Sequence, residues 1–394
     1  MNIEAIKAPY GASVGLVMQL ISDYEWPNYR LGYQFKHVKD VLGNNILNKL
    51  SSNNITVGIK YGPLGVDPRA AISNPDEDYF EICARQLLAT EPRIANKLFK
   101  KCKLIINDYN DGGLFLHTVL DRYAEQLETA REVVFAHSIY NLHLDTKWKT
   151  MYIPVYIASG GAYYLREDTY QSNVQIKDML MAVHKPRNFR LEALSYFEEH
   201  DLLDNTDWSL FVIDPTDVTR PGDFHASPSL VNIAFDKKDV YTERSVQFIK
   251  RHETTLPKKL DMGTKQVVDF WDHMLLPEEW KNYKWYVDVE TYIDEIFVTE
   301  KTIKGFVLGL PTIVIGSPGT VQHLKDLGFK LEGNYDVECF EDKMLSIVDH
   351  IKNNTGDKDI ALHNKQLISD VEFLSDLYAN PLIGLAPHTS VGKD

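Results

Sequence analysis

Short apolar segments alternate with longer amphipathic stretches along the whole chain. This alternation is typical of α/β proteins with parallel sheets. It predicts strands at 55–59, 104–106, 133–136, 151–156, 179–183, 210–213, 285–289 and 312–315. It predicts helices at 78–88, 96–101, 114–129, 189–200, 301–308 and 321–327, and a last helical pattern at 358–380.

A chain of 394 residues is longer than one hydrophobic core usually supports, so we expect two domains. The joint is expected between about 160 and 182, because Ser159-Gly160-Gly161 precedes a new apolar strand there. The predicted bounds are 1–175 for the first domain and 176–357 for the second. A C-terminal helical segment, 358–394, is expected to pack back on the first domain.

Composition narrows the class of protein. The formal net charge of −14 argues against broad, nonspecific nucleic-acid affinity but leaves room for a local basic groove. The three cysteines are odd in number and lack metal-ligand spacing, which fits a reducing compartment. The apolar stretch 11–21 is read as a buried element of the first domain, and no apolar run is long enough to span a bilayer. We therefore expect a cytoplasmic protein with no membrane partner.

The segment 296–311 carries the clearest sign of chemistry. Thr299 is a good N-cap, Glu300 and Lys301 occupy the first helical turn, and Gly309 is placed to end the helix. A helix N-terminus favours phosphate, and a lysine there adds a full positive charge for a diphosphate. Glu300 fits the hydroxyl groups of a ribose. The alternative is that Glu300 merely complements the helix dipole and Lys301 is solvated.

A second basic segment follows the predicted strand 179–183. Arg187 and Arg190 belong to the run 184–190, which joins that strand to the next helix. Ligands of open α/β sheets bind outside the carboxyl ends of strands, and arginine grips phosphate oxygens with two parallel hydrogen bonds. A solvent-facing basic loop is the alternative.

These motifs resemble those of a known group of enzymes. A strand, then Arg-x-x-Arg at a helix start, and later Thr299-Glu300-Lys301, is similar to the nucleotide-binding domain of fucosyltransferase-type GT-B glycosyltransferases. Glycosyltransferase-like proteins of tailed phages are more similar still. The matching segments are 185–194, 287–291, 297–301, 316–319 and 327–329, so the resemblance covers roughly 180 to 335. In the first domain only the segment 104–113 shows a weak similarity.

The resemblance implies an α/β fold of the GT-B type, with two Rossmann-like domains facing a central cleft. The first would be the acceptor side, and the second would bind a nucleotide-sugar. Arg187 or Arg190, together with Lys301, would bind the diphosphate, and Glu300 the ribose. Thr299 and Glu290 complete the expected donor-binding residues. The nucleotide base and the sugar do not follow from it.

The expected chemistry is sugar transfer without a metal or cofactor, the nucleotide-sugar being a co-substrate. GT-B enzymes generally stabilise the leaving diphosphate with fixed cations and helix dipoles. The sequence shows no metal cluster, Walker loop, GxGxxG or HExxH. Candidates for the base that deprotonates the acceptor are Asp108 and Asp111, with His137 as the alternative.

Double-stranded DNA is the favoured acceptor, because phage transferases of this sort often decorate hydroxylated bases. Trp26 and Tyr29 lie where aromatic and cationic residues mix, and Lys100 and Lys101 lie in a basic cluster. Ordinary core and solvated faces explain both features equally simply. A surface polysaccharide, a protein acceptor and a non-catalytic nucleotide-sugar-binding protein stay open as alternatives. The oligomeric state does not follow from the sequence.

Overall fold

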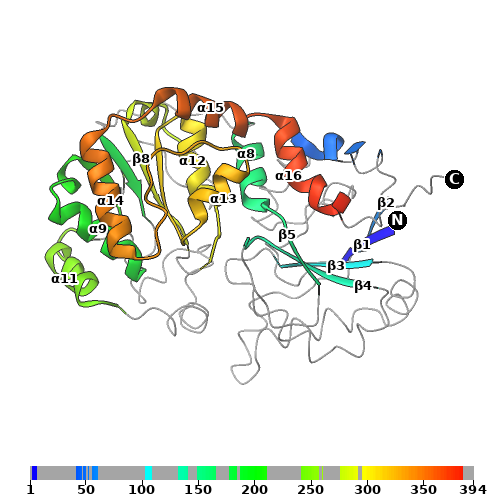
Figure 1. Ribbon diagram of the computed structural model, residues 1–394, viewed down its shortest axis with the longest axis horizontal. Coiled ribbons are helices and arrows are strands. Elements are labelled where there is room, and N and C mark those ends of the chain that lie inside the picture. The colour runs from blue at the N-terminus through cyan, green and yellow to red at the C-terminus, as the bar shows by residue number, and fades with distance from the viewer. Residues whose placement is uncertain are drawn as a thin grey trace, which may run out of the picture. The chain divides into compact units, whose positions relative to one another are not determined.

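The computed structural model describes residues 2–6, 41–46, 48–49, 52, 56–60, 103–108, 132–140, 149–165, 177–183, 187–210, 241–256, 260, 276–291 and 295–384. The chain forms two compact units, the first comprising Met1–Arg166 with Asp370–Asp394 and the second Glu167–Ser369 (Figure 1). The bounds 1–175, 176–357 and 358–394 stay a prediction, since compactness does not test which stretches fold alone. That the domains face a central cleft stays a prediction too.

The first unit is built on a five-stranded parallel sheet in the order β2-β1-β3-β4-β5. The strands are β1 Asn2–Ile6, β2 Thr56–Lys60, β3 Lys103–Asp108, β4 Glu132–His137 and β5 Lys149–Tyr152. The direction in which the chain adds strands reverses between β1 and β3. In open parallel sheets this switch point is where ligands bind, outside the carboxyl ends of the strands.

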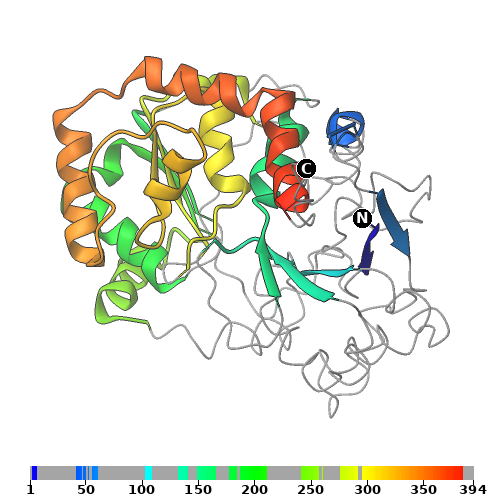
Figure 2. The ribbon, with the colours of Figure 1, turned by 45° about the vertical axis from the view of Figure 1, so that its right-hand side comes forward.

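Two helices of the first unit pack against each other: α8 Val155–Tyr164 and α16 Val371–Gly384 (Figure 2). The strand predicted at 151–156 is therefore wrong beyond Tyr152, because Pro154 takes the N-cap position of α8. The Gly160-Gly161 pair lies inside this helix rather than at a joint. Both glycines are buried.

The second unit is built on a four-stranded parallel sheet in the order β7-β6-β8-β9. Its strands are β6 Met179–Ala182, β7 Thr206–Ser209, β8 Trp285–Val289 and β9 Thr312–Ile315. Its α-helices are α9 Asn188–Glu199, α11 Glu243–His252, α12 Glu300–Leu308, α13 Thr320–Asp326, α14 Phe340–Asn353 and α15 Lys358–Ile368. Two 3-10 turns are η2 Leu203–Asn205 and η4 Glu278–Asn282.

Helices cover both faces of this second sheet. Figures 1 and 2 show α9 and α14 on one side of β8 and α12 on the other. α9 contacts α14, and α12 contacts α15. β8 and β9 are buried over their whole lengths, as strands covered on both faces must be. The predicted α/β class is confirmed, and each of the two units contains a parallel sheet.

The sequence predicted six helices and strands of the second unit in place, but it did not predict α11 or α14. β6, β8, β9, α9, α12 and α13 are all present, and Gly309 ends α12 in the left-handed conformation, at φ 69°. The strand predicted at 210–213 begins earlier, at Thr206, and 211–213 lie outside the described residues. Polar residues at its start interrupt the apolar pattern by which strands are predicted. The Thr206 hydroxyl donates to the Leu202 carbonyl, and Asp207 accepts from the Tyr283 hydroxyl.

Several other predicted elements lie outside the described residues. These are the helices at 78–88, 96–101 and 114–129 and the apolar stretch 11–21. The helical pattern predicted at 358–380 is two helices: α15 belongs to the second unit and α16 to the first. Within the described part of the chain, no helix combines the length and the apolar character needed to cross a membrane.

Gly305 lets α12 lie close against the sheet. A Cβ atom at this position would stand 2.5 Å from Tyr286 Cδ1 and closer still to Thr312 Oγ1. Tyr286 is fixed as well, since its hydroxyl donates to the Lys301 carbonyl over 3.0 Å. The helix could accept a side chain at this position only by moving away from β8 and β9.

We expect Gly305→Ala to lower the free energy of unfolding by about 1–3 kcal/mol, the usual range for overpacking a core. Gly384→Ala is the control, because a Cβ at Gly384 meets no atom within 4 Å. Urea unfolding, monitored by circular dichroism, measures both variants. Equal midpoints would show that α12 does not pack tightly on the sheet.

Candidate functional site

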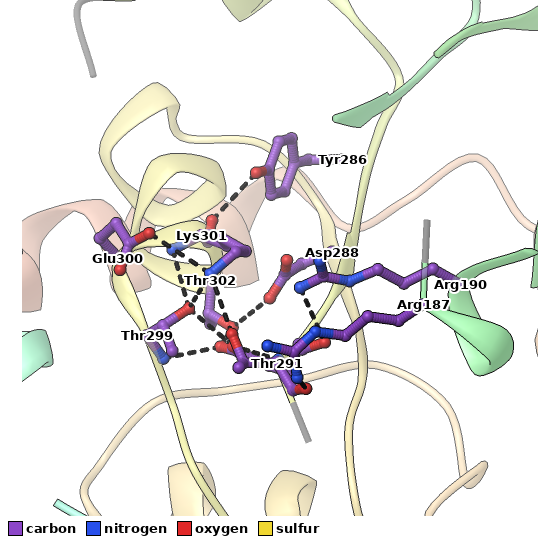
Figure 3. A network of polar contacts seen from close by, with 10 residues as sticks. Arg187, Arg190, Tyr286, Asp288, Thr291, Thr299, Glu300, Lys301 and Thr302 are labelled. Atoms are coloured by element: carbon purple, nitrogen blue, oxygen red, sulfur yellow. Dashed lines mark hydrogen bonds and ion pairs between the residues drawn. The ribbon is translucent and has the colours of Figure 1, made fainter. Parts of the chain in front are cut away.

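The donor-binding residues predicted from the sequence gather at the switch point of the second sheet. Chain order reverses between β6 and β8, so the segments that follow these strands meet at the same edge. Arg187 and Arg190 follow β6, and Glu290 and Thr291 follow β8. The first turn of α12 lies against the same segment, as Figure 3 shows. The topology therefore assembles a site from parts of the chain that are far apart in sequence.

The carboxylate of Glu290 holds the start of α12. Its Oε1 accepts from the Thr299 main-chain N–H at 2.8 Å and lies 2.7 Å from the Thr302 hydroxyl. Its Oε2 accepts from the Thr299 hydroxyl at 2.7 Å and from the Thr291 N–H at 3.3 Å. Glu290 was expected to contact the donor, but it is wholly buried and engaged by the chain itself. Glu290 therefore lies buried against the start of α12, which it binds through Thr299 and Thr302.

Thr299 is the N-cap that the sequence predicts. Its hydroxyl oxygen accepts from the Lys301 main-chain N–H over 3.3 Å. The same hydroxyl donates its proton to Glu290, so it links the first turn of α12 to the buried carboxylate. Thr299 is itself fully buried.

Lys301 and Glu300 are the more accessible members of the site. The Lys301 ammonium lies 3.1 Å from the hydroxyl oxygens of both Thr291 and Thr299, and 3.3 Å from Glu300 Oε1. The two side chains keep 19% and 22% of their surface exposed, respectively. The ammonium is thus held in place by two neutral oxygens and one carboxylate, and the side chain keeps part of its surface exposed.

The two arginines reach the same segment from α9. Arg187, the N-cap residue of α9, donates from Nη1 to the Thr291 carbonyl. Arg190 donates from Nη2 to the Glu290 carbonyl over 3.1 Å. Both are buried, at 7% and 2% exposure. A carbonyl accepts a hydrogen bond without cancelling the charge of the guanidinium.

Two further titratable residues, Asp288 and Lys304, lie next to this site. Burial, and then repulsion from Glu290, raise the pKa of Asp288 well above its usual range. Burial also lowers the pKa of Lys304, one turn after Lys301, while Glu300 opposes that shift. Neither residue was singled out from the sequence. An aspartate inside an otherwise apolar strand, two residues before a glutamate, was the available signal.

The turn after β9 is held by a different pair of charges. Buried Lys343 donates to the Gly316 carbonyl over 2.8 Å, and burial lowers its pKa. Asp336 accepts from the main-chain N–H groups of Gly319 and Gln322 at 3.0 and 3.1 Å. The start of α13 therefore already has a carboxylate, whereas α12 is capped by a neutral hydroxyl.

Two candidates for the catalytic base meet at the carboxyl edge of the first sheet. Asp108 ends β3 at that sheet's switch point, and its register partner on β4 is His137, whose own partner is Tyr152. His137 is buried, its Nδ1 has no hydrogen-bond partner among the described residues, and burial lowers its pKa to about 4. The imidazole is therefore neutral at neutral pH.

The remaining predicted residues lie outside the part of the chain that the structure describes. They are Asp111 among the base candidates, and Trp26, Tyr29, Lys100 and Lys101 among the acceptor-binding candidates. Among the described residues, no three His, Cys, Asp or Glu side chains are grouped to hold a metal ion.

The chain matches no protein-family model and no curated protein. Among solved structures it is similar to "Spinosyn Rhamnosyltransferase SpnG complexed with thymidine diphosphate", at 11% identity, 96% coverage of this chain, 99% of that chain and a TM-score of 0.33. It is also similar to "Crystal Structure of alpha1,3-Fucosyltransferase", at 11% identity, 97% and 90% coverage and a TM-score of 0.39. These structural neighbours are glycosyltransferases. A likeness this distant assigns neither substrate nor site residues to the chain.

The burial of His137, at the carboxyl edge of the first sheet, can be tested through the pH dependence of stability. Its pKa of about 4 lies below the ordinary 6.5, so the unfolded chain binds the proton more readily. The stability contributed by the neutral ring is complete above 6.5 and is lost as pH falls through about 4. We expect His137→Asn to reduce this fall in the free energy of unfolding at low pH by up to about 3 kcal/mol, at ~1.4 kcal/mol per pKa unit. Urea unfolding across that pH range, with NMR titration of the ring, measures it. A ring that titrates near 6.5 contradicts its burial.

Proposed function

We propose that this protein is a glycosyltransferase that binds a nucleotide-sugar at the switch point of its second sheet and moves the sugar to a hydroxyl acceptor. The observation that carries the proposal is the convergence of Lys301, Arg187 and Arg190 on the Glu290-Thr291 segment, at the start of α12. A protein with a net charge of −14 gathers cations at this helix N-terminus.

The local charge balance favours an anionic ligand. Lys301, Arg187 and Arg190 are cationic. Glu290 and Glu300 oppose them, while the raised pKa of Asp288 suppresses its charge. The partial positive charge of the α12 N-terminus adds to this excess. A diphosphate carries the charge and the acceptor oxygens that such a site requires.

The exposed side chains suggest how the donor is bound. The Lys301 ammonium exchanges neutral threonine hydroxyls for phosphate oxygens, which are stronger acceptors. Arg187 or Arg190 adds a second cation to the diphosphate. Glu300 accepts hydrogen bonds from ribose hydroxyls. Thr299 and Glu290 hold the helix start that presents these groups.

Transfer then needs a base and a stabilised leaving group. In an inverting reaction the acceptor oxygen attacks the anomeric carbon, and the bond from that carbon to the diphosphate oxygen breaks. The electron pair leaves with the diphosphate, whose charge the cations of the site stabilise without a metal. The acceptor proton passes to a base from the first unit, for which we propose neutral His137, with Asp108 and Asp111 as alternatives.

Lys301→Ala tests the donor site. We expect it to weaken nucleoside diphosphate binding by about 1.5–3 kcal/mol, the scale of a lost charge-assisted contact. Lys352→Ala, on the exposed face of α14, is the matched control and should bind as the wild type does. Calorimetry with ADP, GDP, TDP and UDP measures the affinities. If Lys301→Ala binds every one of them as tightly as the wild type, the donor site lies elsewhere.

A transfer assay tests the reaction itself. The protein is given a panel of nucleotide-sugars in excess EDTA, with hydroxymethylated DNA, unmodified DNA or an oligosaccharide as acceptor. We expect transfer to survive the chelator and, following the sequence-based expectation of hydroxylated pyrimidines in phage DNA, to label only the modified DNA. His137→Asn should lower the rate at least about a hundredfold, as loss of a general base does.

The other outcomes are informative. Transfer to the oligosaccharide alone replaces DNA by a polysaccharide acceptor. Loss of activity in EDTA, restored by manganese or magnesium, contradicts metal independence. Tight nucleotide-sugar binding with no turnover on any acceptor identifies a non-catalytic binding protein.

A further inference from the structure

Two carboxyl groups meet one hydroxyl beneath the first turn of α12. Asp288 and Glu290 are separated by one residue at the end of β8, so their side chains lie on the same face of the sheet. Thr302 places its Oγ1 2.6 Å from Asp288 Oδ2 and 2.7 Å from Glu290 Oε1 (Figure 3). All three side chains are buried.

This geometry fixes the number of protons. A threonine hydroxyl has one proton and can donate it to one carboxylate only. Both contacts have the length of a hydrogen bond, and two oxygens this close repel each other unless a proton lies between them. The second contact therefore uses a proton that belongs to one of the carboxyl groups. One member of the Asp288–Glu290 pair is a neutral carboxylic acid.

Hydrogen bonding identifies Asp288 as the neutral member. Glu290 also accepts from two main-chain N–H groups and from the Thr299 hydroxyl, which together stabilise a negative charge. Asp288 Oδ1 is buried and has no hydrogen-bond partner within the described ranges. The proton therefore resides on Asp288 Oδ2 and is donated to Thr302 Oγ1, and Thr302 donates its own proton to Glu290 Oε1.

The groups that face Asp288 come from three elements. Glu290 follows it on β8, Lys301 and Lys304 approach from α12, and Arg190 approaches from α9. On β9 its register partner is Val314, which does not titrate. The cations favour ionisation, but burial is the largest influence on the pKa of Asp288, repulsion from Glu290 is second, and both raise it.

We propose that Asp288 is a positioning residue, which holds one proton jointly with Glu290 through Thr302 and so fixes the first turn of α12 for the donor. The proton chain, by which we mean the hydrogen-bonded series Asp288, Thr302 and Glu290, requires no ligand. Its effect on the donor, through Glu300 and Lys301, rests on the function proposed above.

The hydrogen-bonded chain from Asp288 through Thr302 to Glu290 is sensitive to alkali. Because the folded-state pKa of Asp288 is raised, its contribution to stability is complete below the ordinary value of 3.8 and is lost as pH rises through the raised value. Once that proton is lost, Thr302 can donate to one carboxylate only, and the other is repelled. The first turn of α12 then loses one of its attachments to β8.

Infrared spectroscopy of the full chain without ligand tests the proton chain. We expect a carbonyl stretching band of a protonated carboxylic acid at neutral pH, lost on alkaline titration and absent from Asp288→Asn. In the wild type, unfolding in urea should become easier as pH rises, and Asp288→Asn should flatten this dependence, because an amide donates to Thr302 and has no acidic proton to lose. A wild type without the band, or a band unchanged in Asp288→Asn, overturns the proposal.

Nucleoside diphosphate binding tests the positioning role. Thr302→Val removes the hydroxyl and should weaken binding of the ADP, GDP, TDP and UDP set about tenfold, the scale of a hydrogen bond to a charged group. Thr302→Ser keeps the hydroxyl and should restore most of the affinity. Wild-type affinity should also fall in alkali, and this fall should be smaller in Asp288→Asn.

The outcomes separate the two proposals. Equal affinities of folded Thr302→Val and Thr302→Ser overturn the positioning role. If Thr302→Val does not fold, the alkaline fall decides: an equal fall in the wild type and Asp288→Asn overturns that role. A wild type that shows the infrared band but binds no nucleoside diphosphate contradicts the proposed function and leaves the proton chain standing.

Discussion

The buried carboxylate of Glu290 is the interaction on which the site of the second unit depends. It gathers donors from Thr291, Thr299 and Thr302, and so ties the end of β8 to the start of α12. A charge in this position without such donors would cost several kcal/mol, roughly the penalty for an unpaired buried ion. Since the arginines of α9 bind the carbonyls of the same two residues, Glu290 and Thr291, and Lys301 contacts the Thr291 hydroxyl, one short segment orients the three cations of the candidate site.

Sheet topology decides which residues can take part. In each unit the chain order reverses next to the strand whose carboxyl end carries candidate chemistry: β3 with Asp108 in the first, and β6 and β8 in the second. The segments that leave such a switch point diverge to opposite faces of the sheet, which leaves room for a ligand between them. Placement at a switch point therefore supports a functional reading of the basic and acidic residues more strongly than their types alone do.

Local signals in the sequence predicted the helix that carries Glu300 and Lys301. Thr299 and Gly309 bound α12 by capping, which depends on neighbouring residues only, and both act as predicted. The sequence did not reveal what Glu290 does, because its partners come from another element nine and twelve residues away. It likewise missed Asp288 and the true start of β7 at Thr206. Asp288, and Asp207 at the start of β7, each form a hydrogen bond with another element, which no local pattern records.

Two of the helices that begin at the carboxyl edge of the second sheet, α12 and α13, are not equivalent. The first N–H groups of α13 already face the carboxylate of Asp336, which buried Lys343 approaches to 3.9 Å. The cap of α12 is the neutral Thr299 hydroxyl, which itself donates to the buried carboxylate of Glu290. The first N–H groups of α13 therefore bind a carboxylate directly, whereas the start of α12 is linked to Glu290 through Thr299 and carries Glu300 in its first turn. Lys301, held beside that terminus by two hydroxyls, adds a full positive charge there.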